Sequence, residues 1–234
     1  MNPAGQDSNK VWDNDNTVYG PVDLSHVIDW IRENRILPET FIHAQSEDRW
    51  YRAQDLELLR EHFPGREQSA PRAAHYDKSA RINPAERRQF TIFSALTDEE
   101  LEQFSTLGDT YEIAPETLVV RQGDSCDAVH FVLAGVLRVR VLVGDPPDDT
   151  TLCRISAGEF FGEMGLFLQS IRTADVIAES QARLFRMPNN AFQLLVRQMP
   201  QLAAPILYGI ARALASRMAD DSKRLYQDLT SQIL

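Results

Sequence analysis

The sequence predicts an α+β protein. Its main part is an antiparallel β-barrel or jelly roll with flanking helices and a long C-terminal helix, and a small N-terminal α+β domain precedes it. Three observations predict this arrangement. Short strand-like runs separated by turn signals fill residues 117–187, an apolar stripe at helical spacing begins after Pro200, and all three tryptophans lie within residues 10–62.

Residues 1–63 are predicted to fold as the N-terminal domain. Tyr19-Gly20-Pro21 marks a turn, since glycine and proline interrupt regular structure. Ser25 is expected to cap a helix whose apolar residues recur at helical spacing. A short strand over 40–44 and a second helical pattern around Leu56–Leu59 follow. About 50 residues make a thin core, and tryptophans bury large areas in such a core.

The stretch 64–84 differs in composition from its neighbours. It contains Pro64-Gly65, Pro71 and Asn83-Pro84 together with many Arg, Ser and Ala residues and few large apolar ones. This composition predicts a linker, and the alternative is a loop packed on either domain.

Residues 85–199 are predicted to form the barrel. Thr97, with Glu100 three residues later, makes a capping box that opens a helix. Within 135–143, apolar residues alternate with Arg138 and Arg140, which is the pattern of a half-buried strand. The predicted strands are Thr117–Arg121, Val129–Leu133, Gly135–Val143, Thr151–Ile155, Thr173–Glu179 and Ala182–Met187.

Two helices are predicted to end the chain. A short one opens at Pro188-Asn189-Asn190 and runs to about Gln198, and a long one occupies residues 200–234. The apolar stripe of the long helix consists of Leu207, Ala211, Leu214, Met218, Leu225 and Leu229. A helix of this length extends beyond one small barrel, so the excess stripe predicts packing on a second copy and hence a homodimer. Asp221 interrupts the stripe.

Charge and composition limit the possible functions. Net charge is −10, from 24 Lys and Arg against 34 Asp and Glu, which disfavours general binding to nucleic acid. The chain stops at Leu234 without room for a DNA-reading module after the long helix, so we expect no DNA partner. A small anion in a buried pocket is still compatible with this charge.

The chain also lacks the signals of membrane or secreted proteins. No apolar run approaches the length that spans a bilayer, and residues 1–10 are polar. Two cysteines, Cys126 and Cys153, are too few for a disulfide framework. We therefore expect a cytoplasmic protein without membrane insertion.

The segment 160–176 carries the candidate binding chemistry. Gly162 lets the backbone turn tightly near a ligand, and Glu163–Leu168 is expected to form one helical turn. Arg172 has a planar fork that fits a phosphate, and the Thr173 hydroxyl and the Ala174 backbone N–H add donors. Glu163 only accepts hydrogen bonds, which suits a sugar hydroxyl and not the phosphate.

This segment resembles the phosphate-binding cassette of the cyclic nucleotide-binding domain family. The resemblance covers about residues 90–225 and includes the opening helix, the turns at Gly123-Asp124 and Ala134-Gly135, and the spacing from Glu163 to Arg172. It implies that Glu163 binds the ribose 2′-hydroxyl and Arg172 the cyclic phosphate. Backbone N–H groups around Gly162, Met164 and Gly165 are implied to assist, as is Thr173. Ile171 departs from the family, which often has proline there.

The nature of the ligand stays open among several alternatives. We expect cAMP in preference to cGMP, with the base between the apolar wall, where Leu142 and Val119 are candidates, and the last helix. One alternative is a barrel without ligand, in which Arg172 and Glu163 form a buried ion pair and the protein is a scaffold. Another is a sensor of a cyclic dinucleotide, which needs a wider pocket.

The N-terminal segment resembles the bacterial GYF-2 type of adaptor domain. Tyr19-Gly20-Pro21, Trp30 and Trp50 carry the resemblance. Related domains bind proline-rich peptides on aromatic surfaces, so the resemblance implies a protein partner. Trp12 and Tyr19 are the candidates for an exposed peptide-binding face, and Trp30 and Trp50 are equally compatible with a core role.

Catalysis and metal binding have no candidate residues in the sequence. The five histidines lack metal-ligand spacing, and no nucleophile–base motif occurs. The combined prediction is a non-enzymatic signalling adaptor that uses cAMP or cGMP as a ligand and needs no metal.

Overall fold

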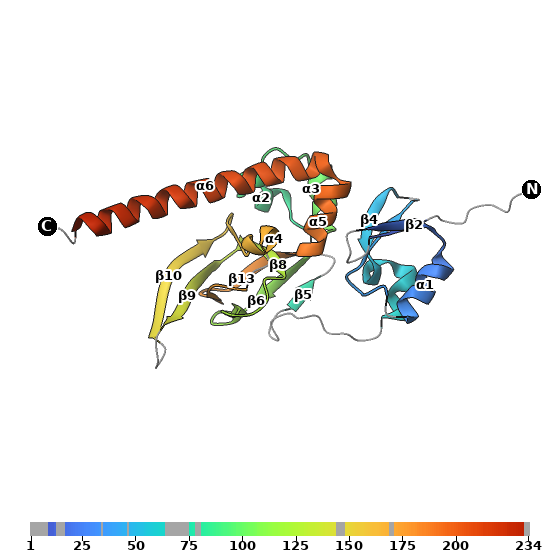
Figure 1. The fold of residues 1–234 in the computed structure, drawn as a ribbon, viewed down its shortest axis with the longest axis horizontal. Coiled ribbons are helices and arrows are strands. Elements are labelled where there is room, and N and C mark those ends of the chain that lie inside the picture. Colours follow the sequence, from blue (N-terminus) through green and yellow to red (C-terminus); the bar gives the residue numbers. More distant parts are fainter. Residues whose placement is uncertain are drawn as a thin grey trace, which may run out of the picture.

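The computed structural model describes residues 9–12, 17–33, 35–45, 47–63, 75–77, 81–143, 148–168 and 171–231. Two units lie side by side: a small N-terminal unit and a larger unit of two β-sheets with helices (Figure 1). The N-terminal unit lies at one end of the molecule, and the distal part of the last helix projects at the other (Figure 1).

The N-terminal unit is a four-stranded sheet with one helix. The strand order is β2-β1-β3-β4, and all three pairings are antiparallel. The bounds are β1 Asn9–Trp12, β2 Val18–Val22, α1 Leu24–Arg32, β3 Phe41–Ala44 and β4 Arg49–Arg52. Asp23, not Ser25, caps α1, because its carboxylate accepts the backbone N–H of His26 at 2.9 Å. The expected second helix is instead two 3-10 segments, Ala53–Asp55 and Glu57–His62.

The larger unit is a jelly roll of two facing sheets and not a closed barrel. One sheet has the order β10-β9-β12-β7, and the other has the order β11-β8-β13-β6-β5. The strands are β5 His75–Asp77, β6 Asp109–Ile113, β7 Leu118–Val120, β8 Ala128–Ala134, β9 Val136–Val143, β10 Asp148–Ser156, β11 Phe160–Phe161, β12 Asp175–Ala178 and β13 Ala182–Pro188. Side chains from both sheets, such as Tyr111, Val132, Leu137 and Val176, form the core between them.

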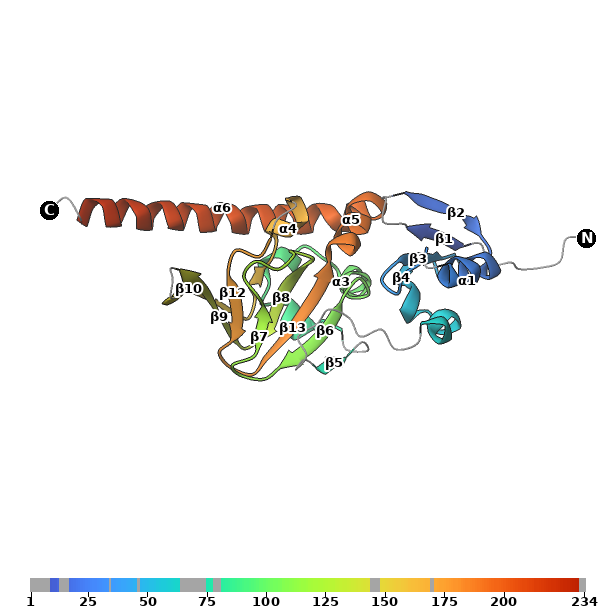
Figure 2. The same cartoon turned by 60° about the horizontal axis from the view of Figure 1, so that its bottom comes forward.

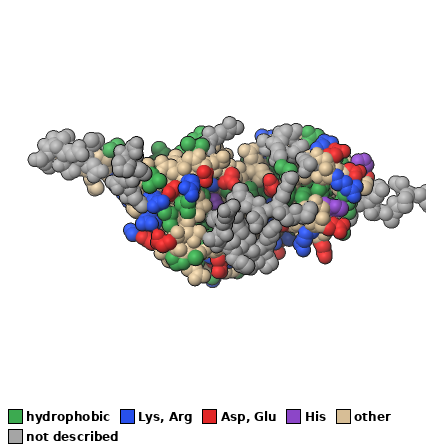
Figure 3. Space-filling model, turned by 90° about the horizontal axis from the view of Figure 1, so that it is seen from below, with side chains coloured by type: hydrophobic (Ala, Val, Ile, Leu, Met, Phe, Trp, Pro, Cys, Tyr) green, Lys and Arg blue, Asp and Glu red, His purple; other side chains and the backbone are tan. Residues whose placement is uncertain are grey.

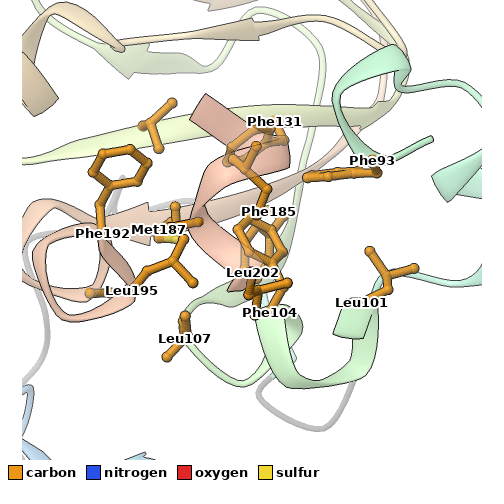
Figure 4. Packing of buried hydrophobic residues seen from close by; sticks show 14 of the residues in the cluster. Phe93, Leu101, Phe104, Leu107, Phe131, Phe185, Met187, Phe192, Leu195 and Leu202 are labelled. Atoms are coloured by element: carbon orange, nitrogen blue, oxygen red, sulfur yellow. The ribbon is translucent and has the colours of Figure 1, made fainter. Parts of the chain in front are cut away.

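Helices cover the outer face of the five-stranded sheet. They are α2 Pro84–Arg87, the 3-10 helix Thr91–Phe93, α3 Asp98–Ser105, α5 Asn189–Gln198 and α6 Pro200–Ser231, while α4 Met164–Phe167 lies between β11 and β12. The predicted capping box of α3 is present, with Thr97 and Glu100 bonded reciprocally. Phe93 and Phe104 pack on Phe131 and Phe185 of the sheet (Figure 4). This second core fixes the helices against the sheet.

The segment predicted as a linker contains a strand. β5 pairs antiparallel with β6, with His75 opposite Glu112 and Asp77 opposite Thr110. Pro84 then begins α2, which Asn83 caps. Through β5, this part of the segment is paired with the sheet of the jelly roll.

The two units share a core, which corrects the expectation for Trp12. Trp12 is only 3% exposed and, together with Phe41 and Trp50, belongs to the same apolar cluster as the helices of the jelly roll. Arg52 of β4 crosses the interface to a buried bidentate ion pair with Asp109 of β6 (Nη2–Oδ1 2.6 Å). Trp12 is thus an interface residue and does not lie on a free peptide-binding face.

The last helix is longer than the jelly roll needs. α6 has 32 residues and runs past the sheets in both views (Figures 1 and 2). Ile206 and Ile210 in its first half are buried, whereas Met218 is 70% exposed and Leu225 61% exposed. Ile206 and Ile210 lie outside the predicted stripe. Of the stripe itself, Leu207 and Leu214 are partly buried against the core, whereas Ala211, Met218 and Leu225 are exposed.

Acidic and basic side chains alternate over the surface seen in Figure 3, without a large region of one sign. Among the described helices, none combines the length and apolarity that a membrane span requires.

Candidate functional site

The cassette folds as a tight turn, one helical turn and a strand. Gly162 has φ +82°, a left-handed conformation that favours glycine, directly after β11. Glu163 occupies the N-cap position of α4, and the chain returns through Ile171 and Arg172 to β12. Backbone bonds hold the returning segment: Arg172 N–H donates to Asp124 O at 2.7 Å, and Gly123 N–H donates to Arg172 O at 2.8 Å. The Gly123-Asp124 turn therefore positions Arg172.

The Arg172 side chain is buried but only partly bonded. It is 5% exposed, and its Nη2 donates to Ala128 O at 2.9 Å and to Asp127 Oδ1 at 3.2 Å. Its Nε and Nη1 have no hydrogen-bond partner among the described residues. A buried guanidinium with unpaired donors is costly, so this geometry is suited to an anion.

A cavity of about 190 Å³ lies beside Arg172. Six of the seven predicted ligand-binding residues line it: Gly162, Glu163, Met164, Arg172, Thr173 and Ala174. Gly165 does not; it packs on Cys126, and its N–H donates to Gly162 O at 3.3 Å. The lining also includes residues that the sequence did not predict as ligand-binding: Val120, Cys126, Val139, Ile155, Phe161, Ile171, Val176 and Arg217.

The apolar wall differs from the expected one. Leu142 and Val119 are outside the cavity lining, and Val120, Val139 and Ile155 supply that wall. Val119 instead belongs to the core between the sheets, and Leu142 is exposed. In a strand, adjacent side chains point to opposite faces, which explains the exchange of Val119 for Val120.

Glu163 is held by the last helix and not by Arg172. Its side chain is 12% exposed, and its carboxylate lies 3.4 Å from Nη1 of Arg217. Arg217 also donates to Phe160 O at 2.7 Å, and its guanidinium lies over the Phe160 ring. The alternative of a direct Arg172–Glu163 ion pair is therefore not what the structure contains. Sequence patterns gave no signal for Arg217.

His130 lies buried beside Phe161, one of the residues that line the cavity. His130 stacks on Phe161 with ring centroids 4.8 Å apart, and its Nδ1 lies 2.8 Å from the Tyr111 hydroxyl. Burial, followed by the charges of Arg172 and Arg186, holds the pKa of His130 well below its ordinary range. His130 is therefore neutral at physiological pH.

Comparison with known proteins identifies the domain that contains the cassette. Residues 111–199 match the family model described as "Cyclic nucleotide-binding domain", and the match contains the whole cassette. These residues form a cyclic nucleotide-binding domain. A crystal structure of a cyclic nucleotide-binding domain from Methylobacillus flagellatus has the same fold (TM-score 0.59, 18% identity, covering 67% of this chain and 89% of that one).

Relatives of this cyclic nucleotide-binding domain occur in larger regulators and enzymes. The CRP-like protein Clp of Xanthomonas oryzae pv. oryzae is 29% identical over 154 residues, which is 63% of this chain and 66% of Clp. Isozyme 1 of the Drosophila melanogaster cGMP-dependent protein kinase is 27% identical over 139 residues, 58% of this chain and 18% of the kinase. The chain thus spans less than two thirds of either relative.

One similar solved structure is that of a regulator that responds to c-di-GMP. The c-di-GMP responsive regulator CLP of Xanthomonas campestris matches with TM-score 0.50 and 26% identity, covering 55% of this chain and 63% of that one.

For metals, the described residues contain no group of three or more His, Cys, Asp or Glu side chains arranged to hold an ion.

Proposed function

We propose that this protein is a signalling regulator that binds a cyclic nucleotide beside Arg172, cAMP in preference to cGMP. The observation that carries the proposal is the buried Arg172 guanidinium, whose Nε and Nη1 lack partners and which lines the cavity. The oxygens of a cyclic phosphate would accept from these donors and compensate the buried charge. Thr173 and Ala174 line the same part of the cassette and add polar contacts.

The remaining groups of the nucleotide have matching surroundings. Glu163 accepts hydrogen bonds from ribose hydroxyls once the Arg217 guanidinium moves away from its carboxylate. Val120, Val139 and Ile155 offer an apolar surface to the base. Guanine brings both a carbonyl and an exocyclic amino group to this surface, whereas adenine brings only the amino group. Unpaired polar groups are costly when buried, which favours adenine.

Titration calorimetry of the full chain with cAMP, cGMP and cyclic di-GMP tests the proposal. We expect cAMP to bind most tightly, Arg172→Gln to weaken it at least 30-fold, about 2 kcal/mol, and Glu163→Gln to weaken it about tenfold. Arg154→Gln is the matched control, because Arg154 is exposed on β10 and pairs with Glu179 outside the cavity. Unchanged affinity in Arg172→Gln, or no binding of any nucleotide, overturns the proposal; the latter leaves a ligand-free scaffold.

A cyclic dinucleotide is the second candidate, and a neighbouring cavity favours it. A hollow of about 500 Å³ between the Thr91–Phe93 helix, Gly158–Phe160 and α6 shares Arg217 with the first cavity. If Arg217 swung aside, the two cavities would join, and Arg212 of the second would face another phosphate. The c-di-GMP response of the similar Xanthomonas campestris regulator supports the same alternative. Tightest binding of cyclic di-GMP in the calorimetry would select it.

We further propose that the chain forms a homodimer through the distal half of α6. Met218, Leu225 and Tyr226 are between 61% and 70% exposed there. A second copy of the helix would remove these side chains from water. Sedimentation should give a dimer mass at micromolar concentration for the natural chain and a monomer mass for Leu225→Glu. A monomeric natural chain at high micromolar concentration contradicts the proposal.

The N-terminal unit is proposed to bind a partner protein through the aromatic residues that stay accessible. Tyr19 is exposed and meets Trp30 edge-on at 6.4 Å, and Arg35 lies over the Trp30 ring. A proline-rich peptide should perturb Tyr19 and Trp30 in an NMR titration and bind more weakly to Trp30→Ala. Peptide-induced shifts confined to other residues would contradict this surface.

A further inference from the structure

The thiol of Cys126 lies inside the cyclic nucleotide-binding cassette. Cys126 is a free, partly buried cysteine that lines the cavity beside Arg172. Its Sγ lies 3.6 Å from the carbonyl oxygen of Gly162, and a Cβ placed on Gly165 would lie only 2.6 Å from Sγ. The thiol therefore touches both glycines of the turn that shapes the cavity. An atom added to this sulfur has to displace that turn or enter the cavity.

The backbone around Cys126 is fixed, so the turn has little freedom to give way. Asn189 at the start of α5 donates from Nδ2 to the carbonyl oxygens of Cys126 (2.7 Å) and Gly165 (3.0 Å). One amide group thus holds the cysteine and the helical turn together. The space open to a modified Cys126 side chain is consequently the cavity itself.

A second observation shows that the same cavity is built to receive an anionic or strongly polar group. The Nε and Nη1 donors of Arg172 are buried and lack partners among the described residues. Gly162 lies between the two groups: its carbonyl contacts Cys126, and a Cβ on it would lie 2.3 Å from Arg172 Nη1. The oxygen of an oxidised cysteine would compete for donors that the proposed ligand needs.

We propose that Cys126 is an oxidation site for hydroperoxides and that its oxidation and ligand binding exclude each other. The second half rests on the proposed cyclic nucleotide function. In the reaction the thiolate attacks one peroxide oxygen, so that an S–O bond forms and the O–O bond breaks. The cysteine becomes a sulfenic acid and the peroxide is reduced. The leaving hydroxide or alkoxide takes up the proton that the thiol released on forming the thiolate, which gives water or an alcohol.

Cys153 provides an internal control within the same chain. It lies on β10, is exposed, and is outside the cavity lining. Although the residue is exposed, its thiol group is partly shielded from water, and this shielding is the main reason why its pKa is raised. A raised pKa lowers the fraction of the thiol present as thiolate. A ligand in the cassette has no reason to change its reactivity.

Peroxide treatment of the full chain, with dimedone to trap sulfenic acid and mass spectrometry to locate the adduct, tests the proposal. We expect the adduct on Cys126, and we expect saturating cAMP to slow its formation at least tenfold. In Cys153→Ala, peroxide should lower cAMP affinity at least tenfold, and dithiothreitol should restore it. In Cys126→Ala, affinity before and after peroxide should be the same.

The possible outcomes separate this inference from the proposed function. An adduct on Cys153 alone, or oxidation of Cys126 without change in affinity, overturns the inference while the nucleotide site stands. If the untreated protein binds none of the three nucleotides, the proposed function fails, and the comparison of Cys126 with Cys153 labelling decides the oxidation site by itself.

Discussion

Arg217, in the middle of α6, lies 3.4 Å from the Glu163 carboxylate at the start of the cassette helix. The same side chain donates to Phe160 O at 2.7 Å, so the last helix is attached to both ends of the Gly162 turn. A ribose hydroxyl at Glu163 and the Arg217 guanidinium would use the same oxygens. Occupation of the cavity is therefore expected to alter the attachment of α6, which shifts the balance between two states of this helix.

The first prediction concerns the release of α6 by the ligand. Hydrogen exchange should show faster exchange of the α6 amides around Arg217 when cAMP is added to the natural chain. Arg217→Gln should exchange fast without ligand and respond little to it. Its free energy of unfolding should fall by about 1 kcal/mol, since the hydrogen bond to Phe160, the ion pair with Glu163 and the cation–π contact are lost. Arg212→Gln is the control on the same helix. Equal exchange in Arg217→Gln and the natural chain would contradict the proposed attachment.

The cassette was predictable because its chemistry is local in sequence. Gly162, Glu163 and Arg172 lie within one turn and the start of one strand, and the structure brings them to one cavity. The missing lining residues come from distant elements: Val120 from β7, Val139 from β9 and Arg217 from α6. An arginine among many polar residues of a long helix carries no periodic signal that would distinguish it.

The position of Trp12 could not be predicted from the sequence for a different reason. A tryptophan predicts a large buried area, but the surface that buries Trp12 belongs to helices far along the chain. The missed strands have local causes. β11 has only two residues, which is too short for a pattern. β6 begins with Asp109, which is buried although a charged residue in a sequence is normally read as a surface residue. Its partner Arg52 lies 57 positions away.

A second prediction concerns the left-handed turn. An alanine side chain at position 162 would place Cβ 2.3 Å from Arg172 Nη1 and 2.7 Å from Ala128 O, at φ +82°. Gly162→Ala should therefore lose about 1–3 kcal/mol of stability and more than tenfold in cAMP affinity. Gly135→Ala is the matched control, with φ +88° and Gln181 O at 2.4 Å but outside the cavity. It should lose similar stability and keep its affinity; equal affinities in the two variants would disprove the role of Gly162.

The buried His130 predicts a pH dependence of stability. Burial, then Arg172 and Arg186, lower its pKa in the folded protein, so His130 stays neutral while the unfolded chain takes up a proton as pH falls through about 6.5. The unfolded state then binds more protons, and the free energy of unfolding falls by up to about 1.4 kcal/mol per pH unit below that value. Urea denaturation between about pH 5.5 and 6.5 should show this slope, and His130→Gln should reduce it. An unchanged slope in the variant would exclude His130 as its source.

The last prediction concerns the ion pair between the two units. Arg52 and Asp109 are both buried and bonded through two N–H···O contacts. Burial alone disfavours the Arg52 charge, but the Asp109 carboxylate more than offsets this and holds the pKa of Arg52 above its ordinary value. Arg52 has a second acceptor in Asp55 at 2.7 Å. Removing Arg52 takes away both N–H donors to Asp109, whereas removing the Asp109 charge leaves Arg52 paired with Asp55.

Arg52→Met should therefore cost about 3–5 kcal/mol, and Asp109→Asn should cost less. Because Trp12 and Trp50 belong to the shared core, denaturation followed by tryptophan fluorescence should change from one transition in the natural chain to two in Arg52→Met, with the N-terminal unit separating first. Arg49→Met is the matched control: Arg49 lies on the same strand, and its exposed pair with Glu102 spans 4.0 Å, so its loss should cost at most about 1 kcal/mol. If both arginine variants lose the same stability and unfold in a single step, the docking of the units depends on the aromatic residues and not on this ion pair.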